Sequence, residues 1–204
     1  MGKRVVIIAS GETERRSLPH LVEHLQAQDI VVTEVRIPPG HRSLNVQMAE
    51  KLVKAAWFDK EIDARPDKFV VLVDTNGMSA EDVLSPFQDQ LAGRIGPNVT
   101  AQLQLAYAQR HLEAWYFADE SGLRKYLGGS LGSIDASAPD QIENPKEHLK
   151  NLLGETAYTA VISEGIAKAL EAQRISQRSP SFQGFLDAVR NGSPTISISQ
   201  VGRK

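Results

Sequence analysis

Two acids, a histidine and three aromatic residues lie together within residues 111–119. A helix places residues three and four positions apart on one face, so Trp115 is expected over Asp119 and Glu113 over Phe117. The carboxylates of such a group could hold a cation or transfer a proton. The spacing alone leaves a second interpretation open, an amphipathic helix whose aromatic side chains are core and whose acids are solvated.

Another acid, Asp74, directly follows the apolar residues 69–73, which predict a strand buried on both faces. Ligands of parallel sheets gather at the carboxyl ends of the strands, near a topological switch point. A carboxylate there can coordinate a hard cation such as Mg²⁺ when other oxygen ligands are present. Asp74 is therefore the best single candidate for catalysis or metal binding, although Asp74 and Asn76 could equally form the turn that Gly77 permits.

A second polar turn, residues 10–14, follows the largely β-branched residues 5–9, which predict the first buried strand. This turn is expected at the same edge of the sheet as Asp74. It carries Glu12 and Glu14, but acids in a first helical turn also stabilise the helix through its dipole. For these two glutamates the dipole interpretation is the stronger one.

Strands and helices alternate along the first half of the chain, which favours a largely parallel sheet flanked by helices. Strands are predicted at residues 5–9, 30–37, 69–73 and 99–107. The second half is predicted to be helical near residues 111–119, 145–153, 157–173 and 181–191, with a glycine-rich loop at 128–139 and a tail from residue 191 that is frayed or forms an edge strand. We therefore expect an α/β core over residues 1–107 and a helical C-terminal part, residues 108–204, packed on it as one unit.

The composition excludes several classes of site. The 204 residues are 41% hydrophobic and 24% charged, as is usual for a globular protein. No cysteine is present, which excludes disulfides, thiolate nucleophiles and cysteine-based metal sites. The net charge of −2 gives no global attraction to nucleic acid or membranes, so contact with nucleic acid would need a local basic patch. No apolar stretch is long enough to span a bilayer, and we expect a soluble, cytoplasmic protein.

Motifs along nearly the whole chain match a known pattern in order and spacing. These motifs are Gly11-Glu-Thr-Glu14, Val-Leu-Val-Asp74, His111-Leu-Glu-Ala-Trp-Tyr-Phe-Ala-Asp119, Asn144-Pro-Lys146 and Ser179-Pro-Ser-Phe-Gln-Gly-Phe-Leu-Asp187. With them the chain resembles the bacterial family catalogued as domain of unknown function 4276. The fold of this family is related to the Toprim domain of topoisomerases, primases and overcoming-lysogenization-defect nucleases. The resemblance implies a small, mainly parallel Toprim-like sheet flanked by helices.

Toprim-type sites imply metal-dependent chemistry on phosphodiesters. A glutamate after the first strand and an Asp-x-Asp motif after a later strand hold one or two Mg²⁺ ions, which stabilise charge on a phosphate. The chain departs from this pattern twice, because Ser10 stands where the family usually has glutamate and Asn76 replaces the second aspartate. Each substitution removes a negative charge, although neutral oxygens can still bind Mg²⁺. Glu12, two residues further along, could replace the lost glutamate.

The resemblance and the strand-end positions together suggest a role for each candidate residue. The expected catalytic residues are Asp74, Glu12 and Glu113. The expected ligands of Mg²⁺ are Asp74, Asn76, Glu12 and Asp119. The expected contacts to substrate come from Ser10, Gly11, Arg110, His111 and Lys146, with the basic side chains facing phosphate.

Three functions are compatible with these residues. The first is a magnesium-dependent nuclease, the effector of a bacterial phage-defence system, which acts on nucleic acid beside an ATPase partner. The second is a non-catalytic, partner-binding subunit of an ATPase-associated complex, which Ser10 and Asn76 favour. The third is an unrelated small-molecule α/β enzyme, which a small apolar pocket around Trp115 and Tyr116 would favour.

Overall fold

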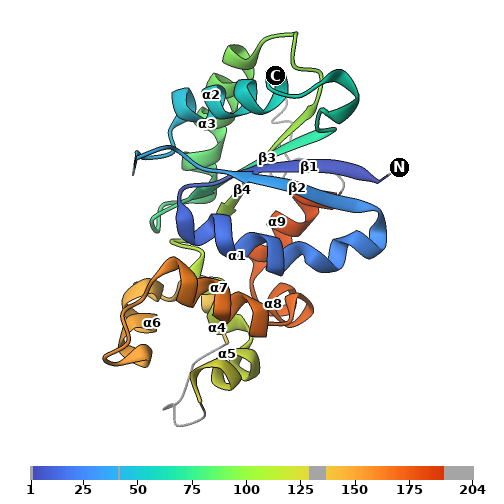
Figure 1. The fold of residues 1–204 in the computed structure, drawn as a ribbon. Helices are drawn as coiled ribbons and strands as arrows, with labels where there is room; N and C mark the ends of the chain where they lie inside the picture. Colours follow the sequence, from blue (N-terminus) through green and yellow to red (C-terminus); the bar gives the residue numbers. More distant parts are fainter. Residues whose placement is uncertain (1, 41, 129–136, 191–204) are drawn as a thin grey trace, which may run out of the picture.

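Two runs of apolar, mostly β-branched residues form the central strands of a four-stranded parallel sheet (Figure 1). The computed structural model describes residues 2–40, 42–128 and 137–190. The strands are β1 (Lys3–Ile8), β2 (Ile30–Arg36), β3 (Lys68–Asp74) and β4 (Gln102–Ala108), in the order β2-β1-β3-β4. The chain adds β2 on one side of β1 and β3 on the other. The loops after β1 and β3 therefore flank the topological switch point, where ligands of such sheets bind.

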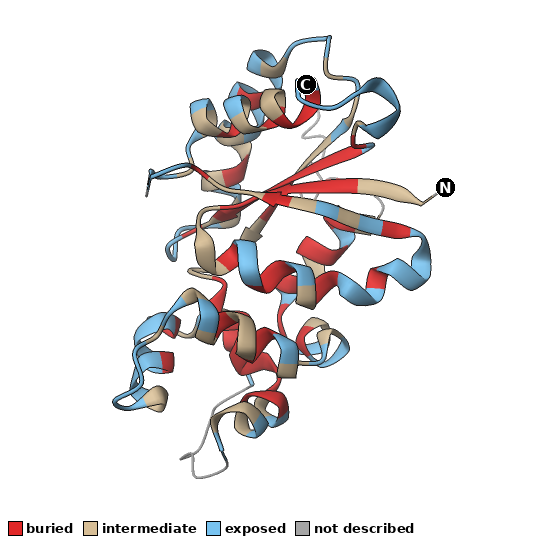
Figure 2. Cartoon of the chain, viewed as in Figure 1, coloured by how far each residue is buried: buried red, intermediate tan, exposed pale blue. Residues whose placement is uncertain are grey.

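Helices cover both faces of this sheet (Figure 1). One face carries α2 (Val46–Phe58) and α3 (Ala80–Ile95), and the other carries α1 (Glu12–Val22) and α9 (Pro180–Arg190). Because side chains alternate along a strand, successive residues of β1 enter different cores, one on each face. Figure 2 shows the buried residues gathered in the strands and on the helix faces turned toward them. The predicted fold class, a parallel sheet flanked by helices with a helical C-terminal part, is confirmed.

The C-terminal helices extend the layer that contains α1. They are α4 (Glu113–Ala118), α5 (Glu120–Leu127), α6 (Pro145–Leu153), α7 (Ala160–Ala169) and α8 (Ala172–Arg178), and short 3₁₀ helices lie at Glu23–Gln28, Ile62–Ala64 and Pro139–Gln141. Helix α7 packs on α1, and α9 returns to the sheet against β4. None of the helices in the described part of the chain is both long and apolar enough to cross a bilayer.

Two helix boundaries differ from the sequence-based prediction. The helix expected over residues 157–173 is divided, because α7 ends at Ala169 and the next two residues are extended. The backbone N–H of Glu171 donates to Asp119 Oδ2 at 2.8 Å, a tertiary contact that no local pattern reveals. Helix α5, which we did not expect, begins directly after Asp119. The tail from residue 191 and most of the glycine-rich loop lie outside the described residues.

The aromatic residues of α4 belong to the core. Residues 115–117 are at most 1% exposed. The Trp115 ring lies 5.0 Å from that of Phe182 and 5.3 Å from that of Phe185, and Trp115 Nε1 donates to Ser181 Oγ at 2.7 Å. Two of the most specific sequence motifs therefore meet in one packing cluster between α4 and α9.

Asp140 holds the start of α9 beside this aromatic cluster. Its carboxylate accepts hydrogen bonds from Ser179 Oγ, Ser181 N and Ser181 Oγ at 2.7 to 3.0 Å. Asp140→Ala leaves these buried donors without their acceptor, so we expect the free energy of unfolding to fall by about 2 kcal/mol in urea titrations. The control Asp89→Ala, at an exposed position of α3, should change it by less than about 0.5 kcal/mol. An unchanged urea midpoint for Asp140→Ala would show that the contacts are not stabilising.

Candidate functional site

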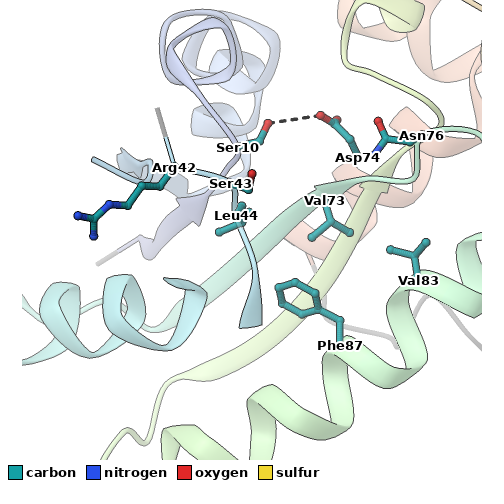
Figure 3. A pocket seen from close by; sticks show the side chains of 9 residues that line it. All are labelled: Ser10, Arg42, Ser43, Leu44, Val73, Asp74, Asn76, Val83 and Phe87. Atoms are coloured by element: carbon teal, nitrogen blue, oxygen red, sulfur yellow. Dashed lines mark hydrogen bonds between the residues drawn. The ribbon is translucent and has the colours of Figure 1, made fainter. Parts of the chain in front are cut away.

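Asp74 ends β3 at the switch point and faces the turn that follows β1. The Asp74 side chain is 21% exposed, and the Ser10 hydroxyl donates to its Oδ2 at 3.4 Å (Figure 3). The next residue, Gly11, is extended and forms the N-cap of α1. A side chain at Gly11 would begin only 3.4 Å from the carboxylate of Glu14. The turn after β1 thus brings Ser10 against Asp74 and sends α1 away from the sheet edge.

Glu14 is the acid of this turn that enters the site. It is only 7% exposed. Burial, the negative charge of Asp74 and that of Glu113 raise the pKa of Glu14 to about 7, against the effect of hydrogen bonds from its own backbone N–H and from Ser10. A buried carboxyl between two further acids is unfavourable when charged, and a bound cation would relieve this repulsion.

Glu12, which the sequence analysis favoured, points elsewhere. Its carboxylate is 41% exposed and pairs with Arg15 at 2.8 Å and Arg16 at 3.1 Å. Of the two glutamates of this turn, the structure buries Glu14 and leaves Glu12 at the surface. A signal for this was present in the sequence, because Glu14 shares its spacing with the buried face of α1. That face is formed by Glu14, Ser17, Leu18 and Leu21.

Glu113 supplies the third acid. It lies at the start of α4, is 3% exposed, and accepts a hydrogen bond from the Tyr158 hydroxyl at 2.9 Å. Burial and the neighbouring Tyr116 and Glu113 raise the pKa of Tyr158, so Tyr158 stays a neutral donor. We call Glu14, Asp74 and Glu113 the acidic cluster. The solvated-acid interpretation of residues 111–119 is wrong, because Glu113 is buried and bonded.

Two basic side chains stand beside the acidic cluster. His111 Nδ1 lies 3.6 Å from Asp74 Oδ2, and this contact raises the pKa of His111 against the opposing effect of burial. The charge of Lys146 acts on His111 in the opposite direction, and Lys146 Nζ lies 5.9 Å from the centre of the Tyr158 ring. The structure thus places one expected substrate-binding residue, His111, next to Asp74, and a second, Lys146, over the ring of Tyr158.

Arg110 contacts the loop that follows Asp74. Asn76, Gly77 and Arg110 have φ angles of 51°, 85° and 63°. This is the left-handed region, which residues other than glycine and asparagine rarely adopt. The Arg110 guanidinium donates to the carbonyl of Glu143 and lies 3.0 Å from the place of a Cβ at Gly77. Arg110 N also donates to Thr75 Oγ1 at 3.2 Å. Arg110 therefore fixes the Asp74–Asn76 loop, and Asn76 lines a cavity beside Asp74.

Asp119, an expected metal ligand, is engaged away from the acidic cluster. It is 1% exposed and caps α5, with Oδ1 accepting from Ser121 Oγ and Gly122 N. Its Oδ2 accepts from Glu171 N, and Arg174 lies 3.5 Å from Oδ1. Burial alone would raise the pKa of Asp119, but these contacts outweigh it and lower the pKa. The structure does not bring Asp119 into the predicted ligand set.

A cavity of about 410 Å³ opens between Asp74 and the α2–α3 face of the sheet (Figure 3). Its polar wall consists of Ser10, Ser43, Asp74 and Asn76, and its apolar wall consists of Leu44, Val73, Val83 and Phe87. Arg42 completes the lining, with its side chain directed away from Asp74 in Figure 3. The sequence analysis missed the apolar wall, because its residues come from three segments that only the fold brings together.

The family model described as "Domain of unknown function (DUF4276)" matches residues 10–190. The chain belongs to this family. No curated protein matches it. Among solved structures, it is similar to the C-terminal region of the Burkholderia pseudomallei OLD protein (15% identity, 93% of this chain and 100% of that chain, TM-score 0.48) and to that of the Xanthomonas campestris pv. campestris OLD protein (16% identity, 92% and 96%, TM-score 0.43).

The match to the DUF4276 family begins at Ser10 and so contains every residue of the acidic cluster and of the cavity. The family predicted from the sequence motifs is confirmed. Trp115 and Tyr116 of this family member are both 0% exposed. In the described part of the chain, these two side chains line no pocket for a small molecule. The small apolar pocket around them that would have favoured an unrelated small-molecule enzyme is therefore absent there.

The side chains of this DUF4276 site fit Mg²⁺ in their chemistry. Mg²⁺ takes hard oxygen ligands, usually one or two carboxylates together with water and substrate phosphate. Asp74 and Glu14 supply such carboxylates, and the oxygens of Ser10 and Asn76 lie at the same sheet edge. Within the described ranges, no group of three His, Asp or Glu side chains is arranged so that it could hold a metal ion by itself. The fit is that of an open site, which substrate oxygens would complete.

Proposed function

We propose that this chain is a magnesium-dependent nuclease that cleaves phosphodiester bonds at the acidic cluster. The observation that carries the proposal is the position of Asp74 at the switch point, where Ser10 and His111 contact it and where its charge and that of Glu113 act on the buried Glu14. Burial and the negative charges of Asp74 and Glu113 make ionisation of Glu14 unfavourable, and a bound cation would offset this effect. Glu14 would supply at this edge the carboxylate that the family usually has at the position of Ser10.

Each residue of the site then has a chemical role. Asp74 and Glu14 would hold Mg²⁺, with Asn76 and Ser10 as neutral oxygen partners. When bound, the ion supplies positive charge to the phosphate oxygens and lowers the pKa of an attacking water. Lys146 would face the substrate phosphate, and His111, whose pKa is raised by its contact with Asp74, would give a proton to the leaving oxygen. Glu113, which accepts a hydrogen bond from Tyr158, raises the pKa of Glu14 through its negative charge.

The biological setting that we propose follows the family resemblance. The nuclease would be the effector of a bacterial phage-defence system and would act on nucleic acid beside an ATPase partner. Lys146 and His111 are the basic side chains that the site offers to phosphate. A local group of this kind can contact nucleic acid although the chain as a whole has a net charge of −2.

A second candidate function is a non-catalytic subunit that binds a partner protein. It is favoured by Ser10 and Asn76, which remove two negative charges from the ligand set that the resemblance implies. In this case the acidic cluster would be a remnant, and the ATPase-associated complex would use the surface around it for contact.

Calorimetric titration with Mn²⁺ and Mg²⁺ separates the two functions. We expect saturable binding to the wild-type protein and its loss in Asp74→Ala, because that change removes a ligand charge. Glu12→Gln is the matched control, since Glu12 is an exposed acid of the same turn that pairs with Arg15 and Arg16. It should bind metal like the wild type. Absence of binding at millimolar metal would favour the non-catalytic subunit.

A further inference from the structure

The cavity next to Asp74 has two walls of opposite character. In Figure 3 the Phe87 ring is directed toward Leu44 and Val73, whereas the side chains of Asp74 and Asn76 lie at the other end of the space. Phe87, Leu44 and Val83 are each partly buried, so they present apolar surface to the cavity while packing on the α2–α3 core. A ligand of this cavity must be apolar on its face and polar along one edge.

We propose that this cavity binds one unpaired nucleobase of a nucleic acid strand, with the adjoining phosphate at Asp74. The inference rests on the proposed function and specifies its substrate class, a single-stranded or frayed strand. The intact duplex is a poor substrate, because paired and stacked bases hide the faces that the cavity would cover.

Size and chemistry both suit a single base. A volume of about 410 Å³ is near the lower end of the range for small-molecule sites, roughly 300–1,000 Å³. It has room for a base and its sugar. Aromatic side chains stack on bases whatever their sequence, and Phe87 supplies such a ring. The amide of Asn76 and the hydroxyl of Ser43 can both donate and accept hydrogen bonds, as base edges require.

The position of the cavity links base binding to cleavage. Asp74 belongs at once to the cavity lining and to the acidic cluster. A base seated against Phe87 therefore has its own phosphate at the carboxylate that we propose as the metal ligand. Arg42, at the outer end, is placed for the next phosphate of an extended strand.

The test measures binding without cleavage, in the Asp74→Asn background. Fluorescence anisotropy compares a labelled single-stranded 12-mer of DNA with an abasic strand of the same length and with the corresponding duplex. We expect the single strand to bind about tenfold more tightly than either of the others, the effect of one stacked base. Phe87→Ala should remove this preference. Phe87→Leu, which keeps the apolar packing, should remove it as well, so loss of folding cannot explain the result.

Phe58→Ala is the matched control, because Phe58 is an exposed aromatic residue (54%) at the end of α2, outside the cavity. It should leave the preference unchanged. Equal binding of the intact and abasic strands, or an unchanged preference in both Phe87 variants, overturns the proposal. Binding of deoxyadenosine monophosphate as tight as that of the 12-mer also overturns it, in favour of a free nucleotide. Failure of the proposed nuclease function would appear separately, as absence of Mg²⁺-dependent cleavage by the wild type.

Discussion

Replacing Asp74 with asparagine should lower kcat/KM for Mg²⁺-dependent cleavage of a single-stranded substrate roughly 1,000-fold or more. Asp74 has a position and a set of contacts that no other residue of the site shares. It ends β3 at the switch point, it accepts a hydrogen bond from Ser10, and it holds His111 in place. Asparagine has nearly the same shape, so the fold is kept while the charge is lost. Steady-state cleavage of a labelled oligonucleotide measures the effect.

The control for this prediction is Glu12→Gln, which we expect to retain activity within about twofold. Glu14→Gln should behave like Asp74→Asn, because it removes a proposed ligand charge rather than an exposed one. The opposite order, with Glu12→Gln inactive and Glu14→Gln active, would restore the assignment made from the sequence. Cleavage by Asp74→Asn at the wild-type rate would remove the acidic cluster from catalysis altogether.

The sequence predicted the sheet edge of this site well, because strand burial and strand ends are local signals. Residues 69–73 are apolar throughout, and a parallel strand of that kind must end at a polar turn. This reasoning placed Asp74 and Ser10 where the structure has them. The same reasoning cannot tell Glu12 from Glu14, because both follow the strand within one helical turn. Only the packing of α1 decides which of the two faces Asp74.

The contributions of the C-terminal helices depend on contacts between distant residues. Asp119 looked like a ligand because it ends an acidic and aromatic segment, but its partner Glu171 lies 52 residues away. Tyr158, which orients Glu113, lies 45 residues from it. Such pairs follow from how α4 packs against α6 and α8 and how α7 packs on α1, and no spacing within one segment carries that information.

Glu14→Gln should also change the pH dependence of stability. The pKa of Glu14 rises from 4.5 in its ordinary state to about 7 in the folded protein. Between these values the folded protein keeps a proton that the unfolded chain has released, so the stability of the wild type falls as the pH rises from about 4.5 to 7. The loss reaches about 3 kcal/mol above pH 7. A glutamine side chain does not titrate, so the variant should lack this loss.

Urea unfolding at pH 4.5, 6 and 8 measures this difference. We expect Glu14→Gln to gain up to about 3 kcal/mol on the wild type between pH 4.5 and 8, whereas Glu12→Gln should follow the wild-type curve because Glu12 is exposed and paired. Saturating Mg²⁺ at pH 8 should raise the unfolding midpoint of the wild type and leave that of Glu14→Gln nearly unchanged, because a bound cation removes the repulsion that the variant no longer has. Parallel curves for wild type and Glu14→Gln at all three pH values would mean that burial and the neighbouring acids do not raise the pKa of Glu14 in the folded protein. The proposed metal site would then lack the unfavourable ionisation of Glu14 that a bound cation is expected to offset.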